Sequence, residues 1–165
     1  MALERREHRI ALEILYAVDV GHRPLDEAIA QARGGVGVFA RGDQAIAEDP
    51  YEPLYPAVER RTDAPRATDW DAVETIVRGT LARKDELEAL VEPLLERWTV
   101  ERLASIDRLI IDIGAWELRY RTDAETLTVI NHAVELARRL STEKSAGFVN
   151  GILDALAKAR PSVRQ

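Results

Sequence analysis

The stretch VERLASIDRLIIDIGAWELRYR, residues 100–121, decides the fold. Its apolar side chains recur every three or four residues and form two overlapping stripes, one through Ile106 and Ile110, the other through Leu109 and Trp116. This spacing is that of an α-helix, and two merged stripes indicate neighbours on two sides. We therefore expect a central, largely buried helix over residues 100–121.

Similar spacing on both sides of this stretch predicts further helices, and no run of alternating β-branched residues predicts a strand. Pro24 is expected to open a short helix, Asp69 to cap the start of another, and Pro93 to kink the next. The expected helices cover residues 3–19, 24–32, 69–81, 87–95, 100–121, 128–140 and 142–159.

The predicted class is therefore all-α, with about seven helices in two small packed bundles. The first bundle is expected at residues 1–98 and the second at residues 99–165. Glycine and proline are concentrated at residues 34–68, so this part of the first bundle is interpreted as a long loop or insert.

Composition excludes several classes of protein. A chain of 165 residues without cysteine has no disulfide and no thiolate metal site. Its net charge of −6 creates no overall attraction for RNA, so any RNA site must be local. No apolar run approaches the ~20 residues of a membrane span, and residues 1–20 do not resemble a signal peptide. We expect a cytoplasmic protein without membrane contact.

Signs of catalysis are absent from the sequence. It has three histidines, and it contains no phosphate-binding loop, hydrolase elbow or His-Glu-x-x-His motif. The pairs Asp19/His22 and His132/Glu135 do not complete a metal site. We expect no enzyme, no cofactor and no metal.

Two features of the last expected helix suggest packing. Gly147 and Gly151 have the spacing that allows two helices to approach closely. Asn150 lies between apolar positions, so its amide is expected to be buried and bonded to a neighbouring helix end.

The first expected helix carries a cluster of arginines. At ~100° per residue and with Arg5 at zero, Arg9 lies near 40° and Arg6 near 100°, beside the apolar arc at about 140–280°. Guanidinium groups bind phosphate and stack on bases, and Tyr16, near 20°, extends this face as a base-stacking or protein-contact residue. The alternative is a solvated helix face, because Glu13 lies in the same sector and can neutralise an arginine.

Taken together, several motifs resemble the NusB family of bacterial antitermination factors. The most specific are INHAVELA at residues 130–137 followed by FVNGILD at residues 148–154. The others are RREHRIALEILY at 5–16, VRG at 77–79, WTVERL at 98–103, DRLI at 107–110 and WEL at 116–118.

This resemblance implies an all-helical protein without catalysis that binds the boxA element of nascent RNA, especially rRNA leaders, together with the ribosomal protein NusE in the transcription elongation complex. RNA contact carries over to Arg5 and Arg6, with Arg9 and His8 as neighbours. NusE contact carries over to Tyr16 and Asp107. Lys144 is a further candidate for phosphate contact, although a cation near helix ends also stabilises the helix dipole.

The sequence departs from the family pattern at three positions. His8 stands where the family has an arginine, His132 follows Asn131 where the family usually has glutamate, and Asp112 stands where an arginine is frequent. The insert at residues 34–68 matches no part of the family pattern.

Two other functions stay open at this point. The chain could be an accessory domain of the kind found in rRNA cytosine methyltransferases, or a protein-protein adaptor whose arginines are only solvated. The sequence also leaves open whether the protein is a monomer or a homodimer.

Overall fold

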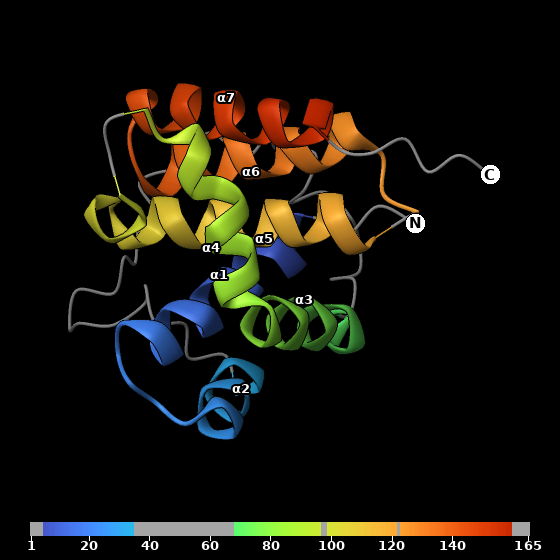
Figure 1. Cartoon of the computed structure of the whole chain (residues 1–165). Helices are drawn as coiled ribbons and strands as arrows, with labels where there is room; N and C mark the ends of the chain where they lie inside the picture. The colour runs from blue at the N-terminus through green and yellow to red at the C-terminus, as the bar shows by residue number, and fades with distance from the viewer. Residues whose placement is uncertain (1–4, 35–67, 97–98, 122, 160–165) are drawn as a thin grey trace.

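A computed structural model describes residues 5–34, 68–96, 99–121 and 123–159 of the chain (Figure 1). These residues form seven α-helices and two short 3-10 helices, and they contain no strand, so the all-α prediction is confirmed. The helices are α1 Arg5–Asp19, α2 Leu25–Arg33, α3 Trp70–Ala82, α4 Lys84–Val91, η3 Glu92–Leu94, η4 Val100–Arg102, α5 Ser105–Tyr120, α6 Thr126–Leu140 and α7 Glu143–Ala159. The insert predicted at residues 34–68 lies almost wholly outside the described residues.

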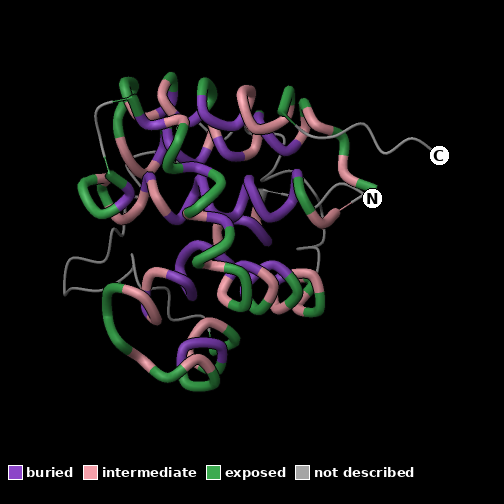
Figure 2. Tube along the Cα trace, in the orientation of Figure 1, coloured by how far each residue is buried: buried purple, intermediate pink, exposed green. Residues whose placement is uncertain are grey.

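Helix α5 is the centre of the molecule, as predicted. It packs against α1 and α3 on one side, α6 and α7 on the other, and α4 crosses it (Figure 1). Every residue from Leu109 to Leu118 is buried, and Figure 2 shows this helix enclosed along most of its length. Two overlapping apolar stripes thus correspond to two layers of neighbours.

The start of this central helix differs from the prediction. Residues 100–102 form η4, and Leu103 is extended, with φ −70° and ψ 144°. The α-helix begins only at Ser105. Periodicity does not reveal the break, because Leu103 and Ile106 keep helical spacing across it and both pack against the core.

Local signals located the starts of α2 and α3 well, but not the bounds of α4. The Asp69 side chain accepts a hydrogen bond from the backbone N–H of Ala72 at 3.0 Å, as expected of an N-cap. Helix α2 follows Pro24. At Pro93 the chain does not kink and continue: α4 ends at Val91 and passes into η3, because proline lacks the N–H that an α-helix needs.

Two glycines allow close packing around α5. A Cβ atom on Gly79 of α3 would lie 2.3 Å from the Trp116 ring, and one on Gly114 would lie 2.7 Å from Leu153 Cδ1. Helix α3 therefore approaches Trp116 more closely than any residue with a side chain would permit.

The predictions for the glycines and the amide of α7 are wrong. A Cβ atom on Gly147 or Gly151 would meet no atom within 4 Å, so these glycines bring no second helix close. Asn150 is exposed, because its position on α7 faces away from α5 and α6. The glycines instead line a groove of about 580 Å³ between α7 and η3.

The division into bundles at residues 1–98 and 99–165 stays a prediction, since α5 contacts helices from both segments. Among the described helices, none is both long and apolar enough to cross a membrane.

Candidate nucleic-acid interface

The first two turns of α1 carry the candidate arginines. Arg6 is half-buried and Arg9 is 42% exposed. The side chain of Arg5 lies outside the described part of the chain, although its backbone belongs to α1. The structure therefore places Arg6 and Arg9 at the helix end expected from the sequence.

Glu13 is a weak competitor for Arg9. Arg9 Nη1 and Glu13 Oε1 are 3.9 Å apart, which is at the limit for an ion pair. Burial raises the pKa of Glu13, and the nearby Arg9 charge lowers it only in part. The sequence left open a solvated helix face on which Glu13 neutralises an arginine. The contact between Arg9 and Glu13 is long, and burial favours the neutral form of Glu13, so this neutralisation is weak.

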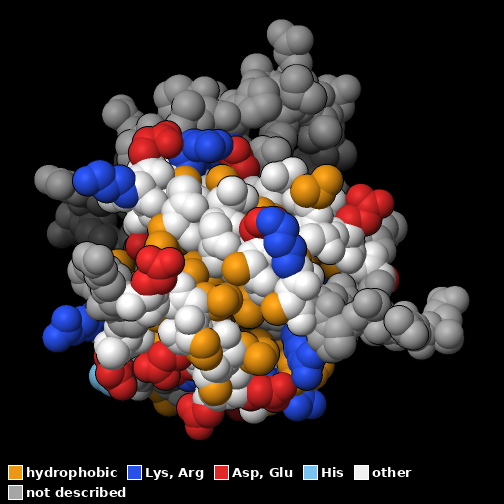
Figure 3. Space-filling view, turned by 45° about the horizontal axis from the view of Figure 1, so that its top comes forward, with side chains coloured by type: hydrophobic (Ala, Val, Ile, Leu, Met, Phe, Trp, Pro, Cys, Tyr) orange, Lys and Arg blue, Asp and Glu red, His pale blue; other side chains and the backbone are white. Residues whose placement is uncertain are grey.

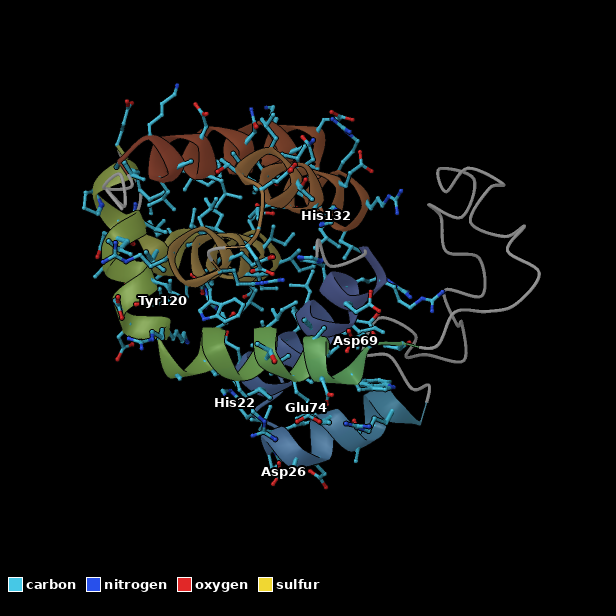
Figure 4. All side chains as sticks on the ribbon, turned by 90° about the vertical axis from the view of Figure 1, so that its right-hand side faces the viewer. His22, Asp26, Asp69, Glu74, Tyr120 and His132 are labelled. Carbon is cyan, nitrogen blue, oxygen red and sulfur yellow. The ribbon has the colours of Figure 1, made fainter. Side chains whose placement is uncertain are left out.

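His8 does not lie on the RNA-facing surface that the sequence predicted. Its side chain is 2% exposed, and its Nε2 is 2.6 Å from Oε1 of Glu117, which is 3% exposed. The ring of His132 packs against it edge to face, with centroids 4.7 Å apart. In Figure 4 His132 lies on α6 where this helix faces α1. We therefore leave His8 out of the surface that would touch RNA.

Sequence reasoning missed Glu7, which is 1% exposed. Its Oε1 accepts a hydrogen bond from the backbone N–H of Asp69 at 3.1 Å, next to the start of α3 (Figure 4). The signal was available: Glu7 projects near 200° when Arg5 is set to zero at ~100° per residue, which is the middle of the apolar arc. A carboxylate there must find a donor inside the protein.

Lys144 is not brought together with the arginines. It is exposed in the first turn of α7. Figure 1 places that turn at the opposite end of the helical layers from the N-terminus. Lys144 is thus separate from the cluster on α1.

Tyr16 and Asp107 differ in their exposure. Tyr16 is half-buried on the second half of α1. Asp107 is buried in the first turn of α5, where its Oδ2 accepts a hydrogen bond from Ser145 Oγ at 2.8 Å. The two helices meet near these residues through an ion pair between Arg108 and Asp19.

Arg108 lies at the centre of a polar cluster. This cluster includes Asp112, one of the positions at which the sequence departs from the family pattern. Its guanidinium pairs with Asp19, with Glu88 Oε1 at 3.3 Å and with Asp112 Oδ2 at 3.9 Å. Lys84 Nζ adds a contact to Asp19 Oδ1 at 2.6 Å. Burial, assisted by the charge of Glu88, raises the pKa of Asp112 to about 8. This buried carboxyl group is therefore a structural element and is not exposed for RNA or partner contact.

Many of the other described cations are engaged by carboxylates. Arg33 pairs with Glu74 at 2.7 Å, Arg138 with Glu135 at 2.9 Å and Lys158 with Asp154 at 2.9 Å. On the face that carries α7, cations lie singly among acidic side chains around an apolar patch (Figure 3). That face offers no concentrated positive charge. Within the described segments, no group of three metal-binding side chains is assembled.

Comparisons with known proteins agree with this arrangement of helices. The chain is 30% identical over 158 residues to the transcription antitermination protein NusB of Geobacillus kaustophilus, covering 95% of this chain and 98% of that protein. It is also 30% identical over 162 residues to NusB of Leifsonia xyli, covering 98% of this chain and 95% of that protein.

Solved structures with lower identity share the fold. T. maritima NusB aligns with a TM-score of 0.63 at 24% identity, covering 96% of this chain and 93% of that one. A structure of NusB and NusE in complex with double-stranded RNA contains a chain with a TM-score of 0.68 at 20% identity, covering 94% of this chain and 96% of that one. The model of the NusB family matches residues 5–158. The chain therefore belongs to the NusB family of transcription antitermination proteins.

Proposed function

We propose that the protein binds the boxA element of nascent RNA through Arg5, Arg6 and Arg9, together with a NusE-type ribosomal protein, within the transcription elongation complex. Family membership supports an antitermination role, and a relative of the same fold has been solved with NusE and RNA. The family is not enzymatic, in agreement with the expectation from the sequence. A role in transcription assigns the protein to the cytoplasm.

One observation carries the RNA part of this proposal: Arg6 and Arg9 lie in the first two turns of α1, and the contact between Arg9 and Glu13 is 3.9 Å long, to a carboxyl group whose pKa is raised by burial. Guanidinium groups stay charged at any physiological pH and present a planar fork that fits phosphate oxygens. Gathered in two turns of one helix, they create positive potential on a protein whose net charge is −6.

The same charge balance explains the need for a partner. Three arginines on an acidic protein neutralise few phosphates, so RNA binding by the protein alone is expected to be weak and sensitive to salt. A basic ribosomal protein bound beside α1 would supply further phosphate contacts. The complex is then the RNA-binding unit.

We assign the partner surface to Tyr16, at the half-buried side of α1, and to the edge of α5 near Asp107. Because Asp107 already accepts a hydrogen bond from Ser145, its contribution would come through the α5 and α7 surface around it. Lys144, exposed on α7 nearby, is a secondary phosphate contact for RNA that extends beyond α1.

The test is a titration of short single-stranded boxA RNA with the protein, with and without the NusE-type partner, at several salt concentrations. The double variant Arg5→Ala/Arg6→Ala should bind RNA at least about tenfold more weakly. Its logarithmic salt slope should fall by roughly 0.7 for each lost phosphate contact, and the melting temperature should stay the same.

The matched control is Arg33→Ala/Arg78→Ala, which removes two arginines that contact Glu74 on the surface of α2 and α3. This control should leave RNA affinity within about twofold of the parent. An unchanged salt slope in the Arg5/Arg6 variant would contradict the proposed site. Binding of the partner without any gain in RNA affinity would favour the adaptor function instead.

A further inference from the structure

We infer that His8 and Glu117 are positioning residues for RNA binding: their buried hydrogen bond holds the first turn of α1 in place, so that its arginines present one fixed surface to the phosphates. The inference rests on the proposed function. It assigns a role to two side chains that lie inside the protein, whereas the proposal above concerns only the surface.

The first turn of a helix needs such support. Its leading N–H groups have no partner within the helix, and terminal turns fray unless tertiary contacts hold them. Arg5 is the first residue of α1, and Arg6 follows it. Without an anchor, these arginines would sample many orientations, and RNA binding would have to order them at a cost in conformational entropy.

The structure supplies an anchor within one turn of these arginines. His8 Nε2 and Glu117 Oε1 are 2.6 Å apart, and both side chains are almost fully buried. A bond between residues separated by 109 positions in sequence fixes α1 directly to the last part of α5. Because a carboxylate accepts, Nε2 carries the hydrogen, and the bond fixes the direction as well as the position of the helix turn.

Neighbouring groups complete the support from other elements. Arg121 Nη1 lies 3.3 Å from the second carboxylate oxygen of Glu117, which orients that carboxylate toward His8. His132 of α6 packs its ring against His8. On the adjacent side of the turn, Glu7 accepts the backbone N–H of Asp69 and so joins α1 to the start of α3. Three elements therefore hold the turn from which the arginines project.

The distinguishing experiment compares two variants at one site. His8→Leu keeps an apolar side chain of moderate size but cannot donate, whereas His8→Gln retains a donor group that can reach Glu117. Affinity for short boxA RNA in the presence of the NusE-type partner is measured for the full chain by fluorescence anisotropy. We expect His8→Leu to weaken binding about tenfold and His8→Gln to recover most of that loss.

The matched control is Leu15→Ala, a buried substitution two turns further along α1. Leu15→Val is the milder substitute if the alanine variant does not fold. All variants are measured at a temperature where circular dichroism shows them folded. Hydrogen exchange of the amides in the first two turns of α1 should accelerate in His8→Leu more than in the control.

Each outcome bears on the inference. Weakened binding in His8→Leu, recovery in His8→Gln and unchanged binding in Leu15→Ala support it. Equal losses in His8→Leu and Leu15→Ala overturn it, because general stability then explains both. If His8→Leu binds normally while Arg5→Ala/Arg6→Ala binds weakly, the positioning role fails and the RNA site stands. If neither His8→Leu nor Arg5→Ala/Arg6→Ala changes binding, the proposed RNA site fails as well.

Discussion

Helix α1 is fastened to α5 at both ends, and the two fastenings differ in charge. Near its start, His8 bonds to Glu117, whose other oxygen faces Arg121. Near its end, Asp19 pairs with Arg108, which also faces Glu88 and Asp112. We call these the histidine end and the arginine end.

The arginine end holds more acid than its cations neutralise. Asp112 is 2% exposed, and its Oδ2 accepts no hydrogen bond among the described residues. A buried carboxyl group favours its neutral form, and burial, assisted by the charge of Glu88, raises the pKa of Asp112 to about 8. The two ends thus secure the same helix pair, and the arginine end holds a buried carboxyl group whose pKa is raised to about 8.

Removing the hub of the arginine end should have the largest effect. Arg108→Met would leave Asp19, Glu88 and Asp112 facing one another without the guanidinium that lies among them. Leaving buried charge unpaired costs about 3 kcal/mol of unfolding free energy. Urea denaturation followed by circular dichroism measures this loss.

The control for this variant is Arg119→Met on the same helix. Arg119 is exposed, so its replacement should change the unfolding free energy by less than about 0.5 kcal/mol. If Arg108→Met were no more destabilising than this control, the arginine end would not fasten α1 to α5.

The sequence predicted the helices well because their signals are local. Periodicity located the central helix, Pro24 preceded α2, and Asp69 capped α3. The start of α5 was missed because residues 100–104 keep helical spacing while the backbone does not. Glycines show the same limit: Gly79 faces Trp116 and Gly151 faces open space, and nothing local distinguishes them.

The candidate site was predictable only where a helix face is exposed. Angular positions on one helix grouped Arg5, Arg6 and Arg9 without a structure. The contacts of His8 and the environment of Asp112 were not predictable. The partner of His8 comes from a distant segment, and the environment of Asp112 depends on how deeply it is buried. His8 and Glu117 are 109 residues apart, and no spacing rule joins them. Departures from the family pattern at both positions drew attention to them without revealing their burial.

The pH dependence of stability should also distinguish the two ends, with a smaller effect than the replacement of Arg108. The raised pKa of Asp112 means that the folded state keeps a proton that the unfolded state, with a pKa near 3.8, has released. Stability therefore falls as pH rises from about 4 to about 8, and it levels off above that range. Asp112→Asn removes this dependence, because the amide does not titrate.

Urea denaturation at about pH 6, 7, 8 and 9 tests this sign. At the alkaline end the Asp112→Asn variant should be more stable than the parent by at least about 1 kcal/mol, and the difference should shrink toward acid pH. Arg119→Met, an exposed substitution on the same helix, serves as the comparison and should not reproduce this pattern. A parent protein that gained stability up to about pH 8 relative to Asp112→Asn would contradict the buried neutral carboxyl group.

The smallest expected effect is that of replacing Lys84, the second cation that contacts Asp19. Although burial alone would raise its pKa, hydrogen bonds from Lys84 and Arg108 lower the pKa of Asp19 overall. A lowered pKa contributes stability that is present above the unfolded value, near 3.8, and is lost as pH falls through the folded value. Within one cluster, Asp19 and Asp112 thus give opposite pH dependences of stability.

Lys84 is 37% exposed, so water and salt screen its contact with Asp19, and Lys84→Met should cost only about 0.5 kcal/mol near neutral pH. The loss should shrink as pH falls through the lowered pKa of Asp19, where this carboxylate takes up its proton, and should diminish in high salt. Lys158→Met, which breaks an exposed pair with Asp154, provides the matched control and should change stability less. A loss for Lys84→Met that persisted unchanged at acid pH would show that the charge of Lys84 does not hold Asp19. In that case Arg108 alone would neutralise the arginine end.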